Sequence, residues 1–330
     1  MKVEHVDPLQ SDSEPFGGCA ITVGSFDGVH RGHQFLIRSM VDHARSARLE
    51  SVVITFDPLP FEVLDPDAPA ARLTELDEKL TLLEQLGVDR TAVVRFTNDV
   101  AAIPAEEFVL WICRTNKAQE IWAGADFAFG HRREGTVDLL EELGPELGFE
   151  ATILPRVEFD GGRMASSVIR SMLGGGEVRE AAVLLGRLPA VAGTIVHGAG
   201  RGQDLGYPTA NLVIALHTLV PKTGIYAGFA VLGKERLPAA VSIGYNPTFG
   251  ANPLSVEAYI LDFDRDIFGE RLRIEFVDRL RDELYFDSVD ALVVQIGEDV
   301  SKVRSILAAY DRHGRVRRGP ATVKTWRKRA

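Results

Sequence analysis

Residues 19–155 alternate between short β-branched runs and segments with the spacing of amphipathic helices. The strand-like runs are CAITVG, SVVITF, VDRTAVVRF, EIWAGA and FEATILP, and the helix-like segments between them include HQFLIRSMVDHARSARL and TELDEKLTLLEQLG. Strands and helices that take turns along a chain form a parallel sheet covered on both faces. The sequence therefore predicts a doubly wound, Rossmann-like α/β domain in the first part of the chain.

The pattern changes after SSVIRSMLGGGEVREAAVLLGRL, in which GGG indicates a break between two short helices. The next runs are VAGTIVHG, GIYAGFAVL, PAAVSIG, LSVEAYILDF and ERLRIEFVDRL, and SVDALVVQIGEDVSKVRSIL follows them. Closely spaced strands between turn residues are typical of a small antiparallel β-barrel, here closed by a helix. Because 330 residues suffice for two cores, we predict domains at 1–186 and 187–312, followed by a tail at 313–330.

Charge is distributed unevenly along the chain. Residues 1–186 contain 31 acidic and 17 basic side chains, whereas residues 313–330 contain seven basic and no acidic ones. Nucleic-acid affinity depends on basic surfaces that contact phosphates, so the acidic first domain does not suggest such a partner. The basic tail is expected to be a solvated end, although contact with phosphate or an anionic surface is an alternative.

The two cysteines, Cys19 and Cys113, are not in a paired metal or redox spacing. They therefore suggest a reducing compartment and no disulfide framework. No stretch approaches the ~18 apolar residues of a membrane span, and the first eighteen residues lack an apolar core typical of a leader. We expect a soluble, cytoplasmic protein with no membrane partner, and the sequence leaves its oligomeric state open.

The segment GSFDGVHRGH, residues 24–33, follows the first strand and precedes a helix. A helix N-terminus beside the end of a sheet favours an anion, because its backbone N–H groups are unpaired there. His30 and His33, three residues apart, are expected to face this loop, and Gly24 and Gly28 allow close backbone approach. The pattern favours phosphate binding over the alternative of surface or capping histidines.

These residues match the G-x-F-D-G-x-H-x-G-H signature of nucleotidyltransferases related to class I aminoacyl-tRNA synthetases. The chain resembles the bacterial bifunctional riboflavin kinase/FMN adenylyltransferase family, and the resemblance continues through FDPLP (56–60), GADFAFG (124–130) and ASSVIR (165–170). It implies that the first domain adenylylates FMN with ATP, which yields FAD and pyrophosphate. The FMN phosphate is then the nucleophile, so no Ser/His/Asp array is required.

The resemblance implies roles for individual residues of the first domain. His30, His33 and Arg170 are expected to bind ATP phosphates, together with Gly24, Phe26, Asp27, Gly28, Gly32 and Ser167. Residues expected near the flavin are Phe56, Pro58, Asp126, Phe127 and Phe129, although each phenylalanine is equally explained as plain core. Two positions depart from the family: Leu59 replaces the usual histidine of F-x-P-H-P, and Ala165-Ser166-Ser167 replaces Ser-Ser-Thr.

The segment HGAGRGQDLGYPTANL, residues 197–212, combines a glycine-rich loop with Pro-Thr-Ala-Asn. Glycines alone are a weak phosphate signal, but the full run resembles the riboflavin kinase fingerprint. The resemblance implies that Thr209 and Asn211 hold Mg²⁺ and that Glu257 is the base for the riboflavin hydroxyl, unless it is only an outward-facing strand carboxylate. The remaining residues implied are Gly198, Gly200, Arg201 and Gly202 at ATP, and Asn246, Arg281 and Phe286 at the flavin, with Tyr285 where a lysine is common.

The sequence thus predicts a two-step enzyme that phosphorylates riboflavin to FMN and then forms FAD, each step using ATP and Mg²⁺. One alternative is that only the kinase module is active, because Leu59 departs from the family at the adenylyltransferase site. Another is a nucleic-acid-binding protein that uses the synthetase-like fold and the basic tail. The acidic first domain and the absence of a K-M-S-K-S-like loop argue against that second alternative.

Overall fold

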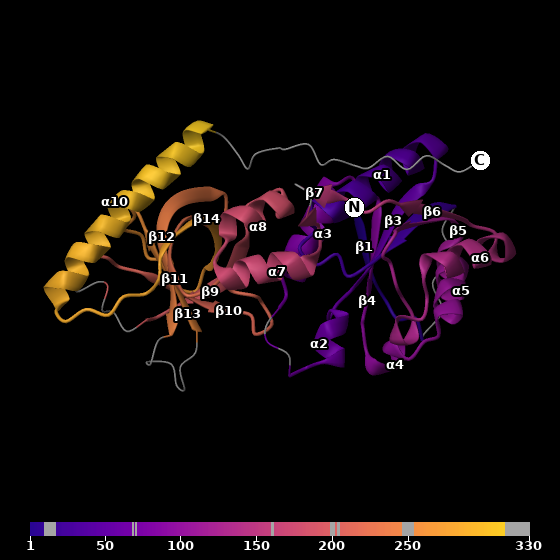
Figure 1. The fold of residues 1–330 in the computed structure, drawn as a ribbon, viewed down its shortest axis with the longest axis horizontal. Helices are drawn as coiled ribbons and strands as arrows, with labels where there is room; N and C mark the ends of the chain where they lie inside the picture. Colours follow the sequence, from indigo (N-terminus) through magenta and orange to yellow (C-terminus); the bar gives the residue numbers. More distant parts are fainter. Residues whose placement is uncertain are drawn as a thin grey trace. The chain divides into compact units, whose positions relative to one another are not determined.

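The structure of the chain is a computed structural model that describes residues 1–9, 18–67, 69, 71–159, 162–198, 202, 205–245 and 254–313. The described residues form two compact units, which divide between Ser166 and Ser167 (Figure 1). The sequence prediction set the domain boundary twenty residues later, after residue 186. The two short helices that precede residue 186 belong to the second unit by their contacts.

A six-stranded parallel sheet forms the centre of the first unit, in the order β1-β4-β3-β2-β5-β6. Its strands are β1 (Lys2–Val6), β2 (Cys19–Val23), β3 (Glu50–Phe56), β4 (Arg90–Val94), β5 (Ala118–Gly124) and β6 (Glu150–Leu154). Its helices are α1 (Arg31–Ala47), α2 (Pro60–Leu64), α3 (Leu76–Gln85), α4 (Asn98–Ala101), α5 (Ala105–Asn116) and α6 (Val137–Leu147). A short 3₁₀ helix (His131–Arg133) and the hairpin β7 (Glu158–Phe159) and β8 (Gly162–Arg163) complete the unit.

Helices cover both faces of this sheet, which confirms the predicted doubly wound fold. One core contains Ile21, Ile54 and Ile121 of the sheet with Phe108 of α5 and Leu140 of α6. A second core packs Ile37 and Met40 of α1 and Leu83 of α3 against Ala20 and Val53. Neighbouring residues of β2 and β3 thus contribute to opposite cores, as expected for strands buried on both faces.

The first strand of the sheet was not expected from the sequence. The predicted series of strands began at residue 19, whereas β1 pairs in parallel with β4, with Lys2 across from Arg90 and Val6 across from Val94. Its side chains are exposed or half-buried, as expected at a sheet edge. The sequence KVEHV lacks the apolar run that indicates a buried strand.

The second unit is a closed antiparallel barrel in the order β10-β13-β12-β11-β14-β9, as predicted. Its strands are β9 (Ala190–Val196), β10 (Ala210–Ile214), β11 (Gly224–Leu232), β12 (Glu235–Tyr245), β13 (Leu254–Ile260) and β14 (Arg271–Arg281). The sequence analysis found five of these runs and missed β10. The helices are α7 (Ser166–Gly175), α8 (Val178–Leu185) and α10 (Val289–His313).

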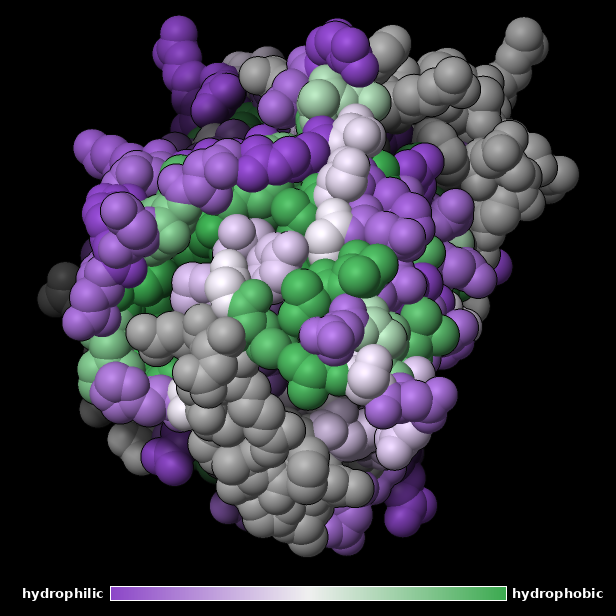
Figure 2. Space-filling view, turned by 90° about the vertical axis from the view of Figure 1, so that its left-hand side faces the viewer, coloured by the Kyte–Doolittle hydropathy of each residue, from purple (hydrophilic) through white to green (hydrophobic). Residues whose placement is uncertain are grey.

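Helices α8 and α10 pack on the outside of the barrel. Ala182 of α8 and Val303 and Leu307 of α10 share a core with Phe229 of β11 and Val277 of β14. Figure 2 shows a group of hydrophobic residues, in green, among hydrophilic ones on the exposed face of this unit. Among the described residues, no helix of the chain has the length and apolar character needed to cross a membrane.

Candidate active sites

Three loops that carry predicted site residues leave neighbouring strands of the first unit. Strand β2 lies between β3 and β5, and all three are parallel. The loops that follow them contain His30 after β2, Asp57, Pro58 and Leu59 after β3, which ends at Phe56, and Asp126–Phe129 after β5. The carboxyl ends of parallel strands share one edge of a sheet, and ligands of open α/β sheets bind at such an edge. The topology therefore brings these three segments to a common edge.

His30 and His33 lie together at the start of α1. His30 is the N-cap residue, and its Nδ1 accepts a hydrogen bond from the backbone N–H of His33 at 3.3 Å. The two rings stack with centroids 3.6 Å apart, and Phe26 contacts His33 edge-on at 5.2 Å. An added Cβ on Gly32 would lie 3.2 Å from the His30 ring. The H-x-G-H spacing thus packs both imidazoles at the helix N-terminus.

His33 is kept neutral by its surroundings. Burial lowers its pKa well below the usual value of 6.5, and the nearby charges of His30 and Lys79 act in the same direction. Among the described residues, its Nδ1 is buried without a hydrogen-bond partner. Unpaired buried nitrogens are costly, so this atom is available to a ligand.

The carboxylate of Asp27 anchors its own loop. It is 2 % exposed and accepts hydrogen bonds from the backbone N–H groups of Leu73, at 3.0 Å, and Thr74, at 3.2 Å. Its backbone carbonyl accepts a hydrogen bond from the Ser166 hydroxyl at 2.9 Å. Asp27 therefore fixes the loop that leads to His30, and its predicted contact with phosphate remains a prediction.

The predicted flavin-side residues differ in burial. Phe56 is half-buried and contacts Phe96 edge-on with centroids 5.5 Å apart, whereas Phe129 is 7 % exposed and belongs to the core. Phe127 is half-buried and stacks on Phe129 at 5.1 Å. Asp126 is exposed, and Arg156 lies 4.0 Å from its carboxylate. Of the three phenylalanines, Phe56 and Phe127 have surface to offer a flavin.

The other predicted residues of this site occupy different surroundings. Pro58 follows Asp57 through a cis peptide bond, and Leu59 is 1 % exposed. Ser167 is exposed and Arg170 half-buried, both in α7 of the second unit. Their predicted roles at the phosphates remain predictions.

In the second unit, strand register brings three predicted residues together. Asn211 of β10 pairs with Glu257 of β13, and Glu257 pairs with Ser242 of β12, so their side chains share a face of the barrel. The Thr209 hydroxyl donates to Oε2 of Glu257 at 3.3 Å, and Nδ2 of Asn211 donates to the Thr209 carbonyl at 3.3 Å. Thr209, Asn211 and Glu257 therefore form one polar group.

The glycine-rich segment closely approaches this group. A Cβ added to Gly198 would lie 2.4 Å from Nδ2 of Asn211, and one added to Gly202 would lie 2.4 Å from the carbonyl of Tyr207. Larger residues at either position would displace these atoms. The predicted sites at Gly200, Arg201 and Asn246 lie outside the described residues.

Arg281, predicted at the flavin, anchors α10. Its guanidinium donates to Oδ2 of Asp299 at 2.6 and 3.0 Å and to Oδ1 at 3.2 Å, and Gln295 donates to the same carboxylate at 3.1 Å. Phe286 is half-buried in the segment between β14 and α10. A flavin contact by either residue remains a prediction.

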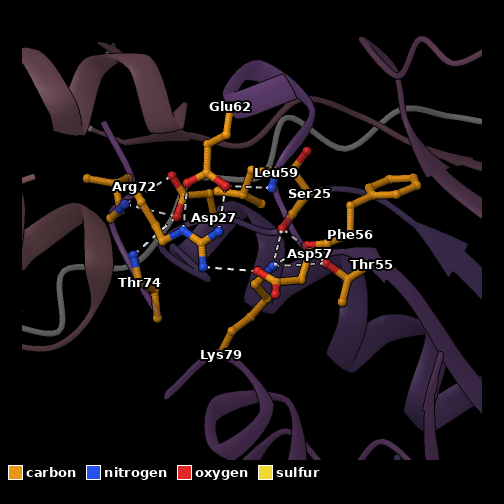
Figure 3. Close-up of polar contacts among 11 residues, drawn as sticks. Ser25, Asp27, Thr55, Phe56, Asp57, Leu59, Glu62, Arg72, Thr74 and Lys79 are labelled. Atoms are coloured by element: carbon orange, nitrogen blue, oxygen red, sulfur yellow. Dashed lines mark hydrogen bonds and ion pairs between the residues drawn. The ribbon is translucent and has the colours of Figure 1, made fainter. Parts of the chain in front are cut away.

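The sequence analysis missed a buried polar cluster in the first unit (Figure 3). Lys79 of α3 is 1 % exposed, and Arg72 forms ion pairs with Asp57, at 3.0 Å, and Glu62, at 2.5 Å. Glu62 in turn accepts the backbone N–H of Leu59 at 2.8 Å. The available signal was the position of Lys79, four residues before the buried Leu83 on the inner face of α3.

Comparison with known proteins identifies the family of both parts of the chain. Residues 12–168 match the FAD synthetase family model, and residues 185–307 match the riboflavin kinase model. The bifunctional riboflavin kinase/FMN adenylyltransferase of Escherichia coli K12 is 36 % identical over 287 residues, which cover 86 % of this chain and 91 % of that protein. The chain belongs to this family. It therefore contains an FAD synthetase domain and a riboflavin kinase domain, as predicted.

Other relatives extend over almost the whole chain. The Bacillus subtilis enzyme of the same name is 33 % identical over 305 residues, which cover 91 % of this chain and 96 % of that protein. A crystal structure from Streptococcus pneumoniae, titled a macrolide-efflux protein, superposes with a TM-score of 0.84. It is 33 % identical and covers 92 % of this chain and 99 % of that one. The two-domain fold is thus shared along the full length.

Proposed function

We propose that Thr209, Asn211 and Glu257 carry riboflavin phosphorylation, and that His30 and His33 carry adenylyl transfer to FMN. The observation that most supports this assignment is that the predicted residues form two groups of side chains, one in each unit. One is a carboxylate with a hydroxyl and an amide on adjacent barrel strands, and the other is a pair of stacked imidazoles at a helix N-terminus. The first suits activation of an alcohol, and the second suits binding of phosphates.

In the kinase reaction, the riboflavin 5′-hydroxyl is a weak nucleophile that needs a base. Glu257 accepts its proton as the oxygen bonds to the γ-phosphorus of ATP, and the bond from that phosphorus to the bridging oxygen breaks to release ADP. The hydroxyl of Thr209 already lies 3.3 Å from the Glu257 carboxylate. A substrate hydroxyl bound in this group is therefore within reach of the base.

The same group fits a Mg²⁺ ion. Mg²⁺ prefers a few hard oxygen ligands, with water and substrate phosphate completing its shell. Thr209 would supply a hydroxyl oxygen and Asn211, 8 % exposed, an amide oxygen, and the missing side chain of Gly198 leaves space for the Asn211 amide. A Mg²⁺ ion held by Thr209 and Asn211 would neutralise charge that develops on the transferred phosphoryl group.

Adenylyl transfer depends on the alignment of FMN and ATP rather than on a general base. An oxygen of the FMN phosphate attacks the α-phosphorus of ATP, and the bond to the β-phosphate breaks to release pyrophosphate. Neutral His33, His30 and the N–H groups of α1 donate hydrogen bonds to the phosphates. Correct orientation of two reactants supplies about 7–11 kcal/mol of barrier reduction. Mg²⁺ accompanies ATP in this step as well.

Small-molecule substrates are the proposed partners, without nucleic acid or membrane. The excess of acidic residues in 1–186 supports this. Both cysteines are unpaired, and burial raises the pKa of the Cys19 thiol to about 12 and that of Cys113 to about 11. Such inert thiols support a reducing compartment, and we assign the protein to the cytoplasm.

The deciding experiment incubates the full chain with riboflavin, ATP and Mg²⁺ and separates FMN and FAD by chromatography. Asn211→Ala is expected to lower FMN formation at least ~100-fold and to leave FAD formation from added FMN unchanged. His30→Ala is expected to stop the chain at FMN. Chelation of Mg²⁺ should abolish both steps. Loss of both activities in either variant, with the fold intact, would contradict two independent sites.

A further inference from the structure

The buried side chain of Lys79 contacts two segments of the proposed adenylyltransferase site, the loop after β2 and the end of β3. Its side chain leaves α3, and Nζ donates hydrogen bonds to the Ser25 carbonyl at 3.1 Å, Oγ1 of Thr55 at 3.2 Å and the Phe56 carbonyl at 3.2 Å (Figure 3). Thr55 also donates to the Ser25 carbonyl at 3.1 Å. One ammonium group thus ties the loop after β2 to the end of β3.

A cation at this position costs folding free energy. Burial lowers the pKa of Lys79 to about 8, although the carboxylates of Asp27, Asp57 and Glu62 oppose that shift and Arg72 adds to it. Lys79 is fully buried on the same face of α3 as Leu83. An apolar side chain of similar length would satisfy that face without desolvating a charge. Packing alone therefore does not explain the lysine.

The two segments that Lys79 connects carry different halves of the proposed reaction. Ser25 precedes Asp27 and His30 in the phosphate-side loop, while Phe56 begins the flavin-side segment that continues to Pro58. An in-line attack requires the FMN phosphate and the α-phosphorus of ATP to be held at a fixed distance and angle. A misplacement of about 1 Å costs ~100-fold in rate.

We propose that Lys79 is a positioning residue for adenylyl transfer, which sets the spacing between the phosphate-side loop and the flavin-side segment through the Ser25 and Phe56 carbonyls. Each of its three N–H donors is matched to one acceptor in the cluster. None is left for substrate, so Lys79 acts through the backbone that it connects. This inference rests on the proposed role of the first unit in FAD formation.

The test compares Lys79→Met with wild type in the full chain. We expect kcat/KM for FAD formation from FMN and ATP to fall 10- to 100-fold. Riboflavin phosphorylation by the same molecules should stay within twofold, because its proposed residues all lie in the second unit. Lys2→Met, which removes an exposed lysine of β1, is the matched control and should leave both activities unchanged.

A pH profile separates positioning from a purely structural role. Above about pH 8 Lys79 loses its proton, and a neutral amine has two N–H donors for three acceptors. FAD formation by the wild type should therefore decline on that alkaline side. Lys79→Arg stays charged at all accessible pH values, so it should retain part of the activity and lack that decline. The groups that face Lys79, namely Asp27, Asp57, Glu62, Arg72 and His33, are unchanged in this variant.

The outcomes are distinct. Full FAD formation by Lys79→Met, or the same alkaline decline in Lys79→Arg and wild type, would overturn the inference. If Lys79→Met does not fold, Thr55→Val decides, because it removes one acceptor at nearly constant volume: a several-fold loss of FAD formation alone supports the inference, and none overturns it. Undiminished FAD formation by His30→Ala would instead overturn the proposed function of the site.

Discussion

His30 and His33 are three residues apart, and their surroundings give the two imidazoles different hydrogen bonds and lower the pKa of His33. His30 caps α1 and accepts the backbone N–H of His33, so its hydrogen-bonding role is assigned before a ligand binds. His33 lies against Phe26 and His30, and burial and neighbouring charge keep its pKa low. A neutral imidazole donates a hydrogen bond to phosphate without repelling Lys79. The low pKa of His33 therefore costs the folded protein some stability in acid.

This arrangement predicts how the stability of the first unit depends on pH. The folded pKa of His33 lies below its unfolded value of 6.5, so below about pH 6.5 the unfolded chain binds more protons and stability falls as the pH falls. One proton gives a slope of at most about 1.4 kcal/mol per pH unit, or about 3–6 °C in unfolding midpoint. Trp111 and Trp122 lie in this unit, so their fluorescence during heating at pH 5–7.5 measures it.

The control for that measurement is His33→Asn, which removes the titrating group. Its midpoint should depend less on pH than that of the wild type between pH 5 and 6.5, with the two proteins parallel above pH 7. An unchanged slope in the variant would assign the acid sensitivity to other groups.

Which residues lie close together could be predicted where a sequence motif contains them. The pairing of Asn211 with Glu257 agrees with the roles inferred from P-T-A-N and S-V-E-A. Lys79 and Asp299 were not predicted. The position of Lys79 four residues before Leu83 was a signal for burial, but a single polar residue in an amphipathic helix is ordinarily exposed. Only the folded chain shows that Lys79 meets three acceptors and Asp299 meets Arg281.

At the scale of elements, the period of apolar residues predicted most of the fold, and the exceptions have local causes. The strand β10 was missed because its first two residues, Ala210 and Asn211, are also the last two of P-T-A-N, whose composition indicates a loop. The edge strand β1 exposes or half-exposes all its side chains and owes its conformation to pairing with β4. The periodicity of apolar residues in one segment does not predict which distant segment it pairs with.

Helix α10 gives a prediction at this scale, because two ion pairs connect it to the barrel. Asp299→Ala would leave the mostly buried guanidinium of Arg281 without its carboxylate; the side chains are 6 % and 19 % exposed. Loss of one partner from such a pair costs about 3 kcal/mol. Urea unfolding followed by far-ultraviolet circular dichroism should show this loss in the second unit.

The second pair provides the matched control. Asp262 accepts both nitrogens of Arg304 at 2.7 Å, but the side chains are 71 % and 49 % exposed. Exposed pairs contribute little because water and salt screen them. Asp262 has a left-handed backbone with φ 57°, which asparagine tolerates better than alanine, so Asp262→Asn should unfold at the wild-type midpoint. Equal losses of unfolding free energy in the two variants would show that burial does not decide how much each ion pair of α10 contributes.

For the whole molecule, the division of residues between the two units matters most. Thr209, Asn211 and Glu257 all belong to the second unit, and His30 and His33 to the first. FMN made at one site is therefore free to reach the other site of any chain, provided that it dissociates. The two reactions then share a substrate and no side chain among these five.

This division predicts complementation between defective chains. Asn211→Ala and His30→Ala, each unable to convert riboflavin to FAD alone, should together form FAD when mixed with riboflavin, ATP and Mg²⁺. FAD should appear after a lag in which free FMN accumulates, and dilution of both chains should lengthen that lag because less enzyme makes and consumes the free FMN. Chromatography of samples over time measures both products. Failure of the mixture, with each variant retaining its other activity, would show that FMN must pass between the two sites of one chain.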